Sequence, residues 1–455
     1  MRVARLAVAL LFALSPTVVL AQDAPERVQA EAEDPDAQES VTSRVPLDEI
    51  RRFVTVYNAV RAAYVDPVDD RQLMQSAVRG LLLELDPHST YFDKEDAQAF
   101  DEQASGAYEG IGVELLQQQD NTLKVVAPID DTPAARAGLR SGDLIVAIDG
   151  KPIAAIEASE PLRGPAGSQV VLTIARDNAA PFDVTVTRET IRITSVRSQL
   201  LEPGYAYVRI STFQADTGAD FQKHVAQLQA QAGGTLRGLV LDLRSNPGGL
   251  LTAAVQVADD LLEKGGIVST RGRISISDAQ FEATPGDLLS GVPVVVLVDA
   301  GSASASEVLA GALRDNGRAR IVGSRTFGKG SVQTVLPLDN GDSVKLTTAR
   351  YYTPSGKSIQ ATGIVPDVEL APDPAAATPD VPASVADFSE ARLPGHLHGD
   401  EEMAGVNAGK VLPGDAPIND ALRELKQPGS VMARAASAVK QGAPATADED
   451  KTGGE

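Results

Sequence analysis

The stretch VPVVVLVDAGSASASEVLAGAL, residues 292–313, decides the fold of this chain. It opens with an almost continuous run of apolar residues, rich in valine, which is typical of a strand that is buried on both faces of a sheet. A glycine and three serines at alternate positions follow, and an alanine-rich run of helical character comes next. The serines are either a packing seam of small residues or they include a nucleophile.

The same alternation of strands and helices extends to both sides of this stretch. Residues 236–244 form a second apolar run of the buried kind, and a glycine turn leads from it into another helical pattern. Strands that alternate with helices favour an α/β core, which we place at residues 191–370. The other elements expected there are strands at 205–213 and within 318–338, a helix at 221–232, and a hairpin turn at 339–342 that leads into a strand at 343–352.

Composition limits the classes of partner. The 455 residues include 62 acidic and 41 basic side chains, for a net charge of −21, and no cysteine. This length suggests two or three domains. A strongly acidic surface repels nucleic acid and anionic membranes, so we expect neither as a partner. Without cysteine, neither disulfides nor thiolate metal sites can form.

The N-terminus has the pattern of an export signal. Arg2 and Arg5 precede a short apolar run, and Val19 and Ala21 are small enough for a signal-peptidase site. The run is too short to span a bilayer comfortably, although an uncleaved membrane anchor is the alternative. We therefore expect a signal peptide at 1–21 and a periplasmic protein, with membrane association left open. The polar, acidic residues 22–45 predict a disordered linker.

Residues 46–105 have mainly helical spacing. Two amphipathic patterns end at Asp66-Pro67 and at Asp86-Pro87, since the residue before a proline disfavours the helical conformation. His88 follows the second pattern. A lone histidine in a loop between helices is more often structural than catalytic, and we interpret it in that way.

Residues 106–190 change to a β-rich pattern of domain size. The segment YEGIGVELL carries a Gly-Ile-Gly-Val loop before a strand, and AGLRSGDLIVAIDGKPI lies downstream of it. These two segments, in this order, resemble a PDZ domain. In such a loop glycines let backbone N–H groups converge on a peptide's terminal carboxylate, while the peptide adds as a strand to a sheet edge. The resemblance makes Gly110, Ile111, Gly112 and Val113 the carboxylate cradle, and the alternative is a tight turn in an ordinary β-domain.

Two places in the core invite chemistry. The first is Asn246-Pro247-Gly248-Gly249, between a strand end and a helix start. Backbone N–H groups at such a turn favour negative charge and would suit an oxyanion hole. A tight turn that merely needs glycine explains the residues equally well, and spacing does not separate the two.

The second place combines the serines with Lys329. A serine needs a base, and none of the four histidines, His88, His224, His396 and His398, lies in a suggestive context. A lysine whose pKa is lowered by burial can serve instead. If Lys329 stands on a strand, it faces the same side as Ser331 and Gln333, and the Gln333 amide could orient the amine. Chemistry alone favours a solvated surface lysine.

The order of three motifs along the chain favours the catalytic interpretation of Lys329 instead. LDLRSNPGG, GSASASEVLAGAL and TFGKGSVQ, preceded by the PDZ-like block, resemble the carboxyl-terminal (tail-specific) processing peptidases, the Ser-Lys proteases of the S41 type, over roughly residues 46–370. The resemblance implies a ClpP/crotonase-like α/β protease core with an inserted PDZ domain and N-terminal helices. It makes Ser304 the nucleophile, Lys329 the general base and Gln333 its orienting partner. It also implies an oxyanion hole from Ala305 with Gly248 or Gly249, and a gating role for Arg163, which in relatives couples the docked tail to the catalytic site.

The expected function is therefore that of an exported serine endopeptidase that binds protein C-termini through its PDZ domain and cleaves through an acyl-enzyme, without metal or cofactor. Its expected partners are protein or peptide substrates with free C-termini and an activating adaptor protein, and we expect a homo-oligomer. The alternatives are a catalytically silent PDZ-type scaffold and a crotonase-like acyl-CoA enzyme. Residues 371–455 predict a mainly disordered tail with one short helix near 418–426, in which His396 and His398 are only weak evidence for a metal site.

Overall fold

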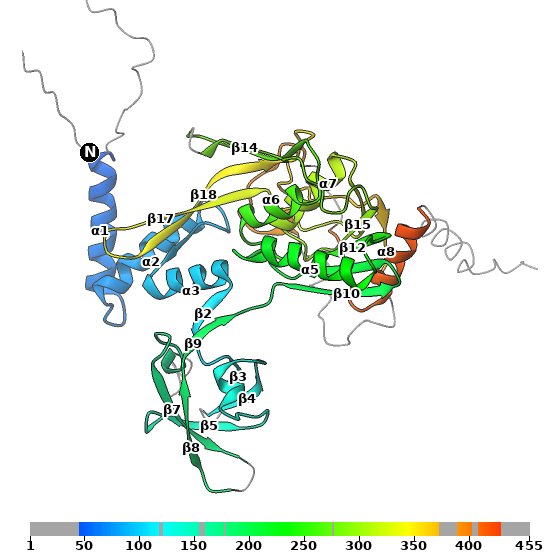
Figure 1. Cartoon of the computed structure of the whole chain (residues 1–455). Coiled ribbons are helices and arrows are strands. Elements are labelled where there is room, and N and C mark those ends of the chain that lie inside the picture. The colour runs from blue at the N-terminus through cyan, green and yellow to red at the C-terminus, as the bar shows by residue number, and fades with distance from the viewer. Residues whose placement is uncertain are drawn as a thin grey trace, which may run out of the picture. The chain divides into compact units, whose positions relative to one another are not determined.

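The structure, a computed structural model, describes residues 45–117, 122–153, 160–176, 179–274, 277–372, 389–402 and 408–428 (Figure 1). The expected signal peptide and nearly all of the expected linker lie outside these residues. By its internal contacts the chain divides into two units, residues 1–73 and 74–455, which are described separately. Within the described residues, no helix has the length and apolarity that a membrane crossing requires.

The first unit contains α1 (Leu47–Ala63) and the start of α2 (Asp70–Leu83). The Tyr57 hydroxyl of α1 donates a hydrogen bond of 3.1 Å to the Asp70 carbonyl, and Arg61 forms an ion pair with the Asp70 carboxylate. None of the residues of α1 is buried in this structure, although several are large and apolar.

The peptidase-like core of the second unit is built on a six-stranded sheet in the order β10-β11-β12-β15-β16-β19. The pair β10–β11 is antiparallel and all the other neighbours are parallel, as the continuous apolar runs predicted. Its strands are β10 (Val196–Glu202), β11 (Tyr205–Ile210), β12 (Gly238–Asp242), β15 (Val294–Val298), β16 (Ala319–Gly323) and β19 (Val368–Glu369).

Helices cover both faces of this sheet. Alternate strand residues point to opposite faces, so Leu239 and Leu241 pack with three helices while Val240 packs with a fourth. The first three are α5 (Thr217–Gln231), α6 (Leu251–Asp259) and α7 (Ala305–Asp315). The fourth, α8 (Ala416–Lys426), packs against β12 and β15 and confirms the short helix expected in the tail (Figure 1).

A second, antiparallel sheet contacts this core, because its strand β13 packs against α6 and α7. Its long strand β18 pairs on one edge with β17 and on the other with β1 and β13, and the hairpin turn expected at 339–342 joins β17 to β18. Its strands are β1 (Thr90–Phe92), β13 (Gly266–Gly272), β14 (Ala279–Glu282), β17 (Ser331–Pro337) and β18 (Ser343–Tyr352).

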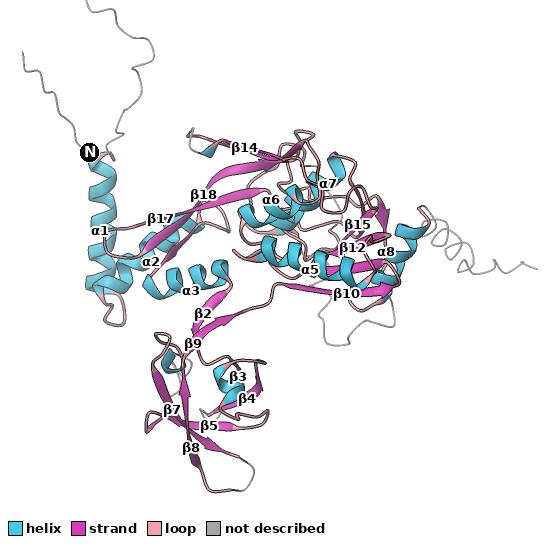
Figure 2. Ribbon diagram, in the orientation of Figure 1, coloured by secondary structure: helices cyan, strands magenta, loops and turns pink. Residues whose placement is uncertain are grey.

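The PDZ-like region forms its own sheet and its own apolar core (Figure 2). The strand order β3-β4-β5-β7-β8 leaves β3, the strand after the glycine loop, at an edge. The pair β2–β9 closes the region, and α3 precedes it in the chain. Its elements are β2 (Ala107–Gly110), β3 (Val113–Gln117), β4 (Leu123–Pro128), α4 (Pro133–Arg136), β5 (Leu144–Ile148), β6 (Lys151–Pro152), β7 (Gln169–Ala175), β8 (Phe182–Thr187) and β9 (Glu189–Arg192), and the preceding helix α3 spans Lys94–Ser105.

Two parts of the expected tail depart from the predicted disorder. Residues 389–402, with a short 3₁₀ turn at Glu390–Arg392, and residues 408–428 bond to the core. Glu390, Leu412 and Ala421 are almost fully buried. The alanine and proline content suggested disorder, but the few apolar and charged side chains in these stretches fill specific places on the core. The remainder of 373–455 lies outside the described residues.

Candidate active site

Ser304 stands at the junction between β15 and α7. It precedes the first helical residue, and its backbone has φ = 54° and ψ = −115°. A positive φ is rare for a residue with a side chain and costs on the order of 1–3 kcal/mol, so the surrounding contacts must impose it. The Ser304 hydroxyl is hydrogen-bonded to the Tyr351 hydroxyl of β18. Burial raises the pKa of Tyr351 to about 12, so this phenol stays protonated at neutral pH.

The three alternating serines have different surroundings. The Ser302 hydroxyl donates to the Leu243 carbonyl at 2.8 Å, and the Ser306 hydroxyl donates to the Asn246 carbonyl at 3.0 Å. Both side chains are fully buried, whereas Ser304 remains 8% exposed. Ser302 and Ser306 therefore fasten the turn to the end of β12, whereas Ser304 caps the helix that it precedes.

The glycine turn after β12 lies directly against Ser304. A side-chain carbon built at Gly248 would lie 2.9 Å from Ser304 Cβ and 3.1 Å from the Ala305 nitrogen. Ala305 is the first residue of α7, where the helix offers its N–H no acceptor. The Gly248 N–H donates to the Asn246 side chain at 2.9 Å, whereas the described bonds give no acceptor to the Gly249 N–H. The structure thus brings all the expected oxyanion residues together and leaves Gly249 the freer glycine donor.

The prediction that Lys329 stands on a strand is wrong. Lys329 lies in the loop before β17, and a bulge between Val332 and Gln333 also interrupts the alternation that was assumed. The loop leaves the sheet because its glycines pack against another backbone segment: a side-chain carbon at Gly330 would lie 2.2 Å from the Gln360 nitrogen. Gly328, with φ = 96°, makes the accompanying turn.

Lys329 is nevertheless not a solvated surface lysine. Burial, together with the nearby ammonium of Lys345, lowers its pKa to about 8. Three carboxylates oppose this effect, those of Glu390, Glu307 and Asp86. A lysine with this pKa has a substantial neutral fraction at slightly alkaline pH, which is the property that a general base requires.

Glu307 connects the serine turn to the lysine loop, and the sequence interpretation missed it. Its fully buried carboxylate accepts hydrogen bonds from the backbone N–H groups of Ser304 at 2.7 Å, Gly328 at 2.7 Å and Lys329 at 2.9 Å. The Thr326 hydroxyl makes a fourth bond to it. Burial raises the pKa of Glu307 to about 7 against the effect of these four bonds. The sequence signal was the acidic residue three positions after a helix-capping serine.

Gln333 does not contact the Lys329 amine in the described bonds. Its amide donates to Ser331 Oγ at 3.0 Å and to Thr347 Oγ1 at 3.2 Å. Thr347 in turn donates to the Asp86 carboxylate at 3.1 Å. The amide is therefore fixed by the strand pair β17–β18 and by the loop that contains Asp86.

The C-terminal stretches complete the loops around the site. The Glu390 N–H donates to the Phe327 carbonyl at 3.0 Å, and the Gln360 amide joins Glu390, at 2.9 Å, to the Gly330 N–H, also at 2.9 Å. Both residues that Glu390 reaches in this way lie within two positions of Lys329. His88 bonds to the same carboxylate at 2.8 Å, which supports its structural interpretation.

The stretch 408–414 fastens the other loops. Arg244, just after β12, donates to the carbonyls of Leu412 and Gly414 at 2.6 and 2.8 Å. The Leu412 N–H donates to the Asp299 carboxylate at 3.1 Å, and the Lys410 N–H donates to Ser324 Oγ at 2.8 Å. One short segment thus contacts the glycine turn, the serine turn and the lysine loop.

The expected cradle has the geometry of a glycine loop at a sheet edge. The Ile111 carbonyl accepts from the Ala134 N–H at 2.8 Å, and the Gly112 carbonyl accepts from the Ile129 N–H at 3.0 Å. Because C=O and N–H point in opposite directions across a trans peptide, the N–H groups of Gly112 and Val113 point away from these contacts. Gly112 has φ = 77°, and a side chain there would overlap Thr132.

Arg163 links the PDZ-like region to the helix before it. Its guanidinium forms an ion pair with Glu102 of α3 and lies over the Tyr108 ring, 5.5 Å from its centroid. The contact is half exposed, so its energy is modest in water. It is nonetheless a direct connection between this region and α3.

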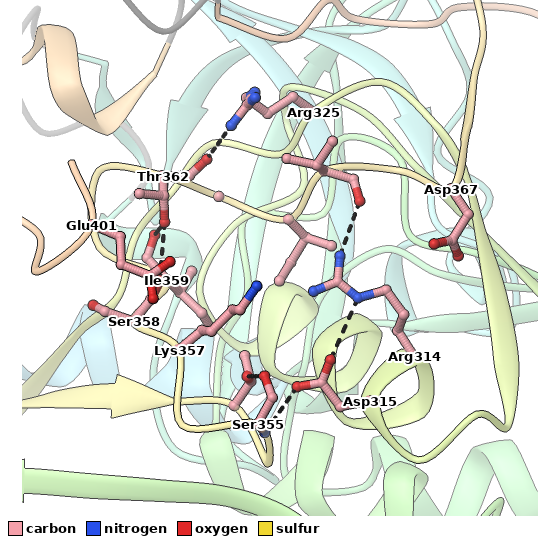
Figure 3. A pocket seen from close by; sticks show the side chains of 14 residues that line it. Arg314, Asp315, Arg325, Ser355, Lys357, Ser358, Ile359, Thr362, Asp367 and Glu401 are labelled. Atoms are coloured by element: carbon pink, nitrogen blue, oxygen red, sulfur yellow. Dashed lines mark hydrogen bonds and ion pairs between the residues drawn. The ribbon is translucent and has the colours of Figure 1, made fainter. Parts of the chain in front are cut away.

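A large cavity lies apart from these residues (Figure 3). It is lined by charged side chains, and the Arg325 guanidinium donates across one wall to the Thr362 carbonyl at 2.8 Å. Arg314, which also lines the cavity, donates to the Val365 carbonyl at 3.0 Å. Neither Ser304 nor Lys329 is among the residues that line it. Its two arginines bond to backbone carbonyls of the loop at residues 362–365.

Comparison with known proteins identifies the family. The model of peptidase family S41 matches residues 204–370, that of the PDZ domain matches 124–176, and that of the "Activating protease CtpB N-terminal domain" matches 10–96. A carboxy-terminal-processing protease of Bartonella bacilliformis is 42% identical over 392 residues, which are 83% of this chain and 88% of that protein. The carboxy-terminal processing protease CtpA of Bacillus subtilis is 33% identical over 319 residues, 69% of this chain and 67% of that protein.

A solved structure of a photosystem II D1 C-terminal processing protease is 34% identical, covers 72% of this chain and 94% of its own, and has a TM-score of 0.42. The family matches and the two curated relatives agree with the expected α/β fold and PDZ domain. The chain therefore belongs to peptidase family S41 and combines a serine-type peptidase domain with a PDZ domain.

Proposed function

We propose that this protein is an exported carboxy-terminal processing endopeptidase in which Ser304 is the nucleophile and Lys329 the general base. The observation that carries the proposal is the Glu307 carboxylate. It accepts the backbone N–H groups of Ser304 at 2.7 Å and of Lys329 at 2.9 Å, which supports a pairing of the strained serine with a lysine whose pKa burial lowers to about 8.

The reaction begins when neutral Lys329 takes the proton of the Ser304 hydroxyl. Serine Oγ then forms a bond to the substrate carbonyl carbon, and the Ala305 N–H, with that of Gly249 or Gly248, stabilises the oxyanion. Loss of one such donor costs about 3 kcal/mol of barrier. The Lys329 ammonium returns its proton to the leaving amine, and water attacks the acyl-enzyme with Lys329 again as base. The Ser304 hydroxyl must first exchange its partner Tyr351 for Lys329.

The PDZ domain supplies the preference for chain ends. The carboxylate of a substrate is received by the loop Gly110–Val113, and its backbone pairs with the free edge of β3. A substrate whose terminal carboxylate is amidated loses the charge that this loop recognises.

The N-terminal unit is proposed to serve assembly and activation. Leu47, Phe53 and Val56 of α1 are large apolar residues that are 46–68% exposed, which suits a contact with a second copy or with an activating adaptor protein. Export to the periplasm rests on the pattern of residues 1–21. A sedimentation measurement of the protein with and without Phe53→Glu tests the assembly.

The decisive experiment compares wild type with Ser304→Ala and Lys329→Ala on an unfolded protein that has an apolar C-terminus. Both variants should lose at least about 10⁴-fold of activity, because each removes one half of the nucleophile–base pair. Ser302→Ala is the matched control and should retain cleavage, since this hydroxyl bonds only the scaffold. An equal loss in Ser302→Ala would refute the assignment, and binding of the substrate without cleavage by wild type would favour the silent scaffold.

Arg163→Ala tests the proposed gating. The substitution removes the ion pair with Glu102, and we expect a several-fold loss of peptidase activity on substrates with a free C-terminus and no change on amidated ones. Glutamate substitution of Lys151, an exposed residue elsewhere in the PDZ domain, is the control. Unchanged activity in Arg163→Ala would remove the gating role.

A further inference from the structure

Three side chains converge in the C-terminal stretch that was expected to be disordered. The candidate ligand atoms of His396, His398 and Glu402 all lie within 4.8 Å of one another. His396 Nε2 is 2.9 Å from one Glu402 oxygen, and His398 Nδ1 is 3.0 Å from the other. We propose that these residues form a site for a divalent transition-metal ion of the zinc class, which fastens residues 389–402 in place.

The hydrogen bonding of His396 prepares it as a ligand. Its Nδ1 is 3.0 Å from the Leu393 carbonyl, and because a carbonyl only accepts, the proton lies on Nδ1. The other ring nitrogen, Nε2, faces a Glu402 oxygen at 2.9 Å and is the atom available to a cation that takes the place of the proton between them. A backbone carbonyl that fixes the ring of a histidine in this way is a regular feature of metal sites.

The backbone of the site is already held by the core. The Leu397 carbonyl accepts from Gln360 at 2.9 Å, the His398 carbonyl accepts from Arg350 at 3.3 Å, and Tyr352 donates to Asp400 at 3.1 Å. The ligands therefore need little reorganisation. A tetrahedral zinc with bonds of about 2.1 Å separates its ligand atoms by about 3.4 Å. The two pairs at 2.9 and 3.0 Å would open by a few tenths of an ångström, and all the ligand atoms already lie within 4.8 Å of one another.

The donor set selects the class of metal. Two imidazoles and one carboxylate suit zinc and its neighbours, whereas magnesium and calcium prefer oxygen ligands. Ion pairing alone accounts for the contact of His396 with Glu402, whose side chains are largely buried. It gives little reason for His398 to join them, because that side chain is 86% exposed and an exposed pair of this kind stabilises a protein by no more than about 1 kcal/mol.

The site connects to the catalytic loops through Gln360. The same amide that holds the Leu397 carbonyl also bonds to Glu390, and its oxygen accepts from the Gly330 N–H beside Lys329. A metal ion that orders residues 396–402 therefore steadies the stretch that supplies Glu390. This is an effect on position, and the ion takes no part in the proposed peptide cleavage.

The test uses full-length protein without a histidine tag, in the Ser304→Ala background. Calorimetric titration with Zn²⁺ should show one ion bound per chain, with Mg²⁺ as the negative comparison. His398→Ala and Glu402→Gln should each weaken Zn²⁺ binding by more than about tenfold. His224→Ala is the matched control, because His224 bonds to Ser198 and lies outside the cluster.

Hydrogen exchange provides the second readout. Zn²⁺ should slow exchange of the backbone amides of 393–402 in the parent and in His224→Ala, but not in His398→Ala. His398 is exposed, so its replacement should leave the fold intact. Absence of Zn²⁺ binding, equal binding to His398→Ala, or bound Zn²⁺ without protection of this stretch would each overturn the proposal.

Discussion

The serine turn and the lysine loop are the two halves of the proposed catalytic pair, and they are built in different ways. The serine turn is bonded mainly to the residues that end and follow β12: Ser302 and Ser306 donate to backbone carbonyls there, and the Ala303 N–H donates to the Asn246 carbonyl at 3.0 Å. A single bond of 3.0 Å, from the Phe327 N–H to the Ser302 carbonyl, joins it to the lysine loop directly. The lysine loop is held by Glu307, by Gln360 and by the C-terminal stretch that carries Glu390.

This difference indicates which of the two segments can be displaced by changes elsewhere in the protein. A turn fixed by a parallel sheet and two fully buried hydroxyls moves only if the core moves. A loop fixed by side chains from three other segments can be displaced by changes in any of them. We therefore expect that the position of the proposed nucleophile stays fixed. The position and the protonation of the proposed base are what changes elsewhere in the chain can alter.

The largest loss of activity should follow from a change in Glu307, whose carboxylate joins the serine turn to the lysine loop. Glu307→Gln keeps the size of the side chain but replaces one acceptor oxygen with a donor, which then faces N–H groups. A misplacement of reacting groups by about 1 Å costs about 100-fold, and we expect a loss of kcat of at least that size. Steady-state kinetics on the unfolded substrate, with circular dichroism to monitor folding, provides the measurement.

Ser306→Ala is the matched control for that variant. It removes a buried bond of the same helix but none to the lysine loop. If Glu307→Gln and Ser306→Ala lowered kcat equally, the alignment of the serine turn with the lysine loop would not depend on the Glu307 carboxylate.

A smaller effect, up to about tenfold, should follow from Glu390→Gln. The Glu390 carboxylate raises the pKa of Lys329, so its removal lowers that pKa further, and more of the amine is neutral at a given pH. With a pKa of about 8, roughly one-tenth of Lys329 is neutral at pH 7, which limits the gain. The rise of kcat/KM with pH should therefore move to lower pH.

The pH profile separates this electrostatic effect from a structural one. Lys345, Glu307 and Asp86 also face Lys329 and are unchanged in the variant. Glu401→Gln, an exposed change in the same stretch, should leave the profile in place. A uniform loss of activity at every pH, without displacement of the profile, would show that Glu390 only supports the loop.

The smallest change in kcat/KM should follow from removal of the Tyr351 hydroxyl, which is hydrogen-bonded to that of Ser304. Tyr351→Phe removes a neutral hydrogen bond worth about 1 kcal/mol, which corresponds to an increase in kcat/KM of at most about fivefold. Tyr205→Phe, whose ring lies on another strand, should leave it unchanged. A loss of more than tenfold in Tyr351→Phe would instead make this hydroxyl part of the catalytic apparatus.

The same contrast explains what the sequence could predict. The parallel sheet, the helix after Ser304 and the glycine turn follow from short-range patterns of apolar residues and glycine, and the structure contains them. The surroundings of Lys329 do not follow from such patterns, because Glu307, Gln360 and Glu390 are brought together only by the fold. The strand geometry assumed for Lys329 therefore failed, because Lys329 lies in the loop before β17, and the bulge after Val332 shifts Gln333 as well.

The tail shows the opposite kind of error. Its composition suggested disorder, yet Leu412, Ile418 and Leu422 each fill a place on the apolar face of the sheet. A handful of well-placed side chains is invisible in a composition average. The functional roles of Ser304, Lys329, Gln333 and the PDZ loop stay predictions until the variants are measured.

The contact of Glu390 with the loop of Lys329 has a consequence for biosynthesis. A ribosome that has translated as far as residue 370 has made every strand of the central sheet, including β19, together with Ser304 and Lys329. The carboxylate that reaches the lysine loop, and the helix that covers the second face of the sheet, are still to come. A nascent chain at that stage contains Ser304 and Lys329 but not Glu390, Leu412 or α8, so the contacts that these residues make with the core form only after the C-terminal stretches have been made.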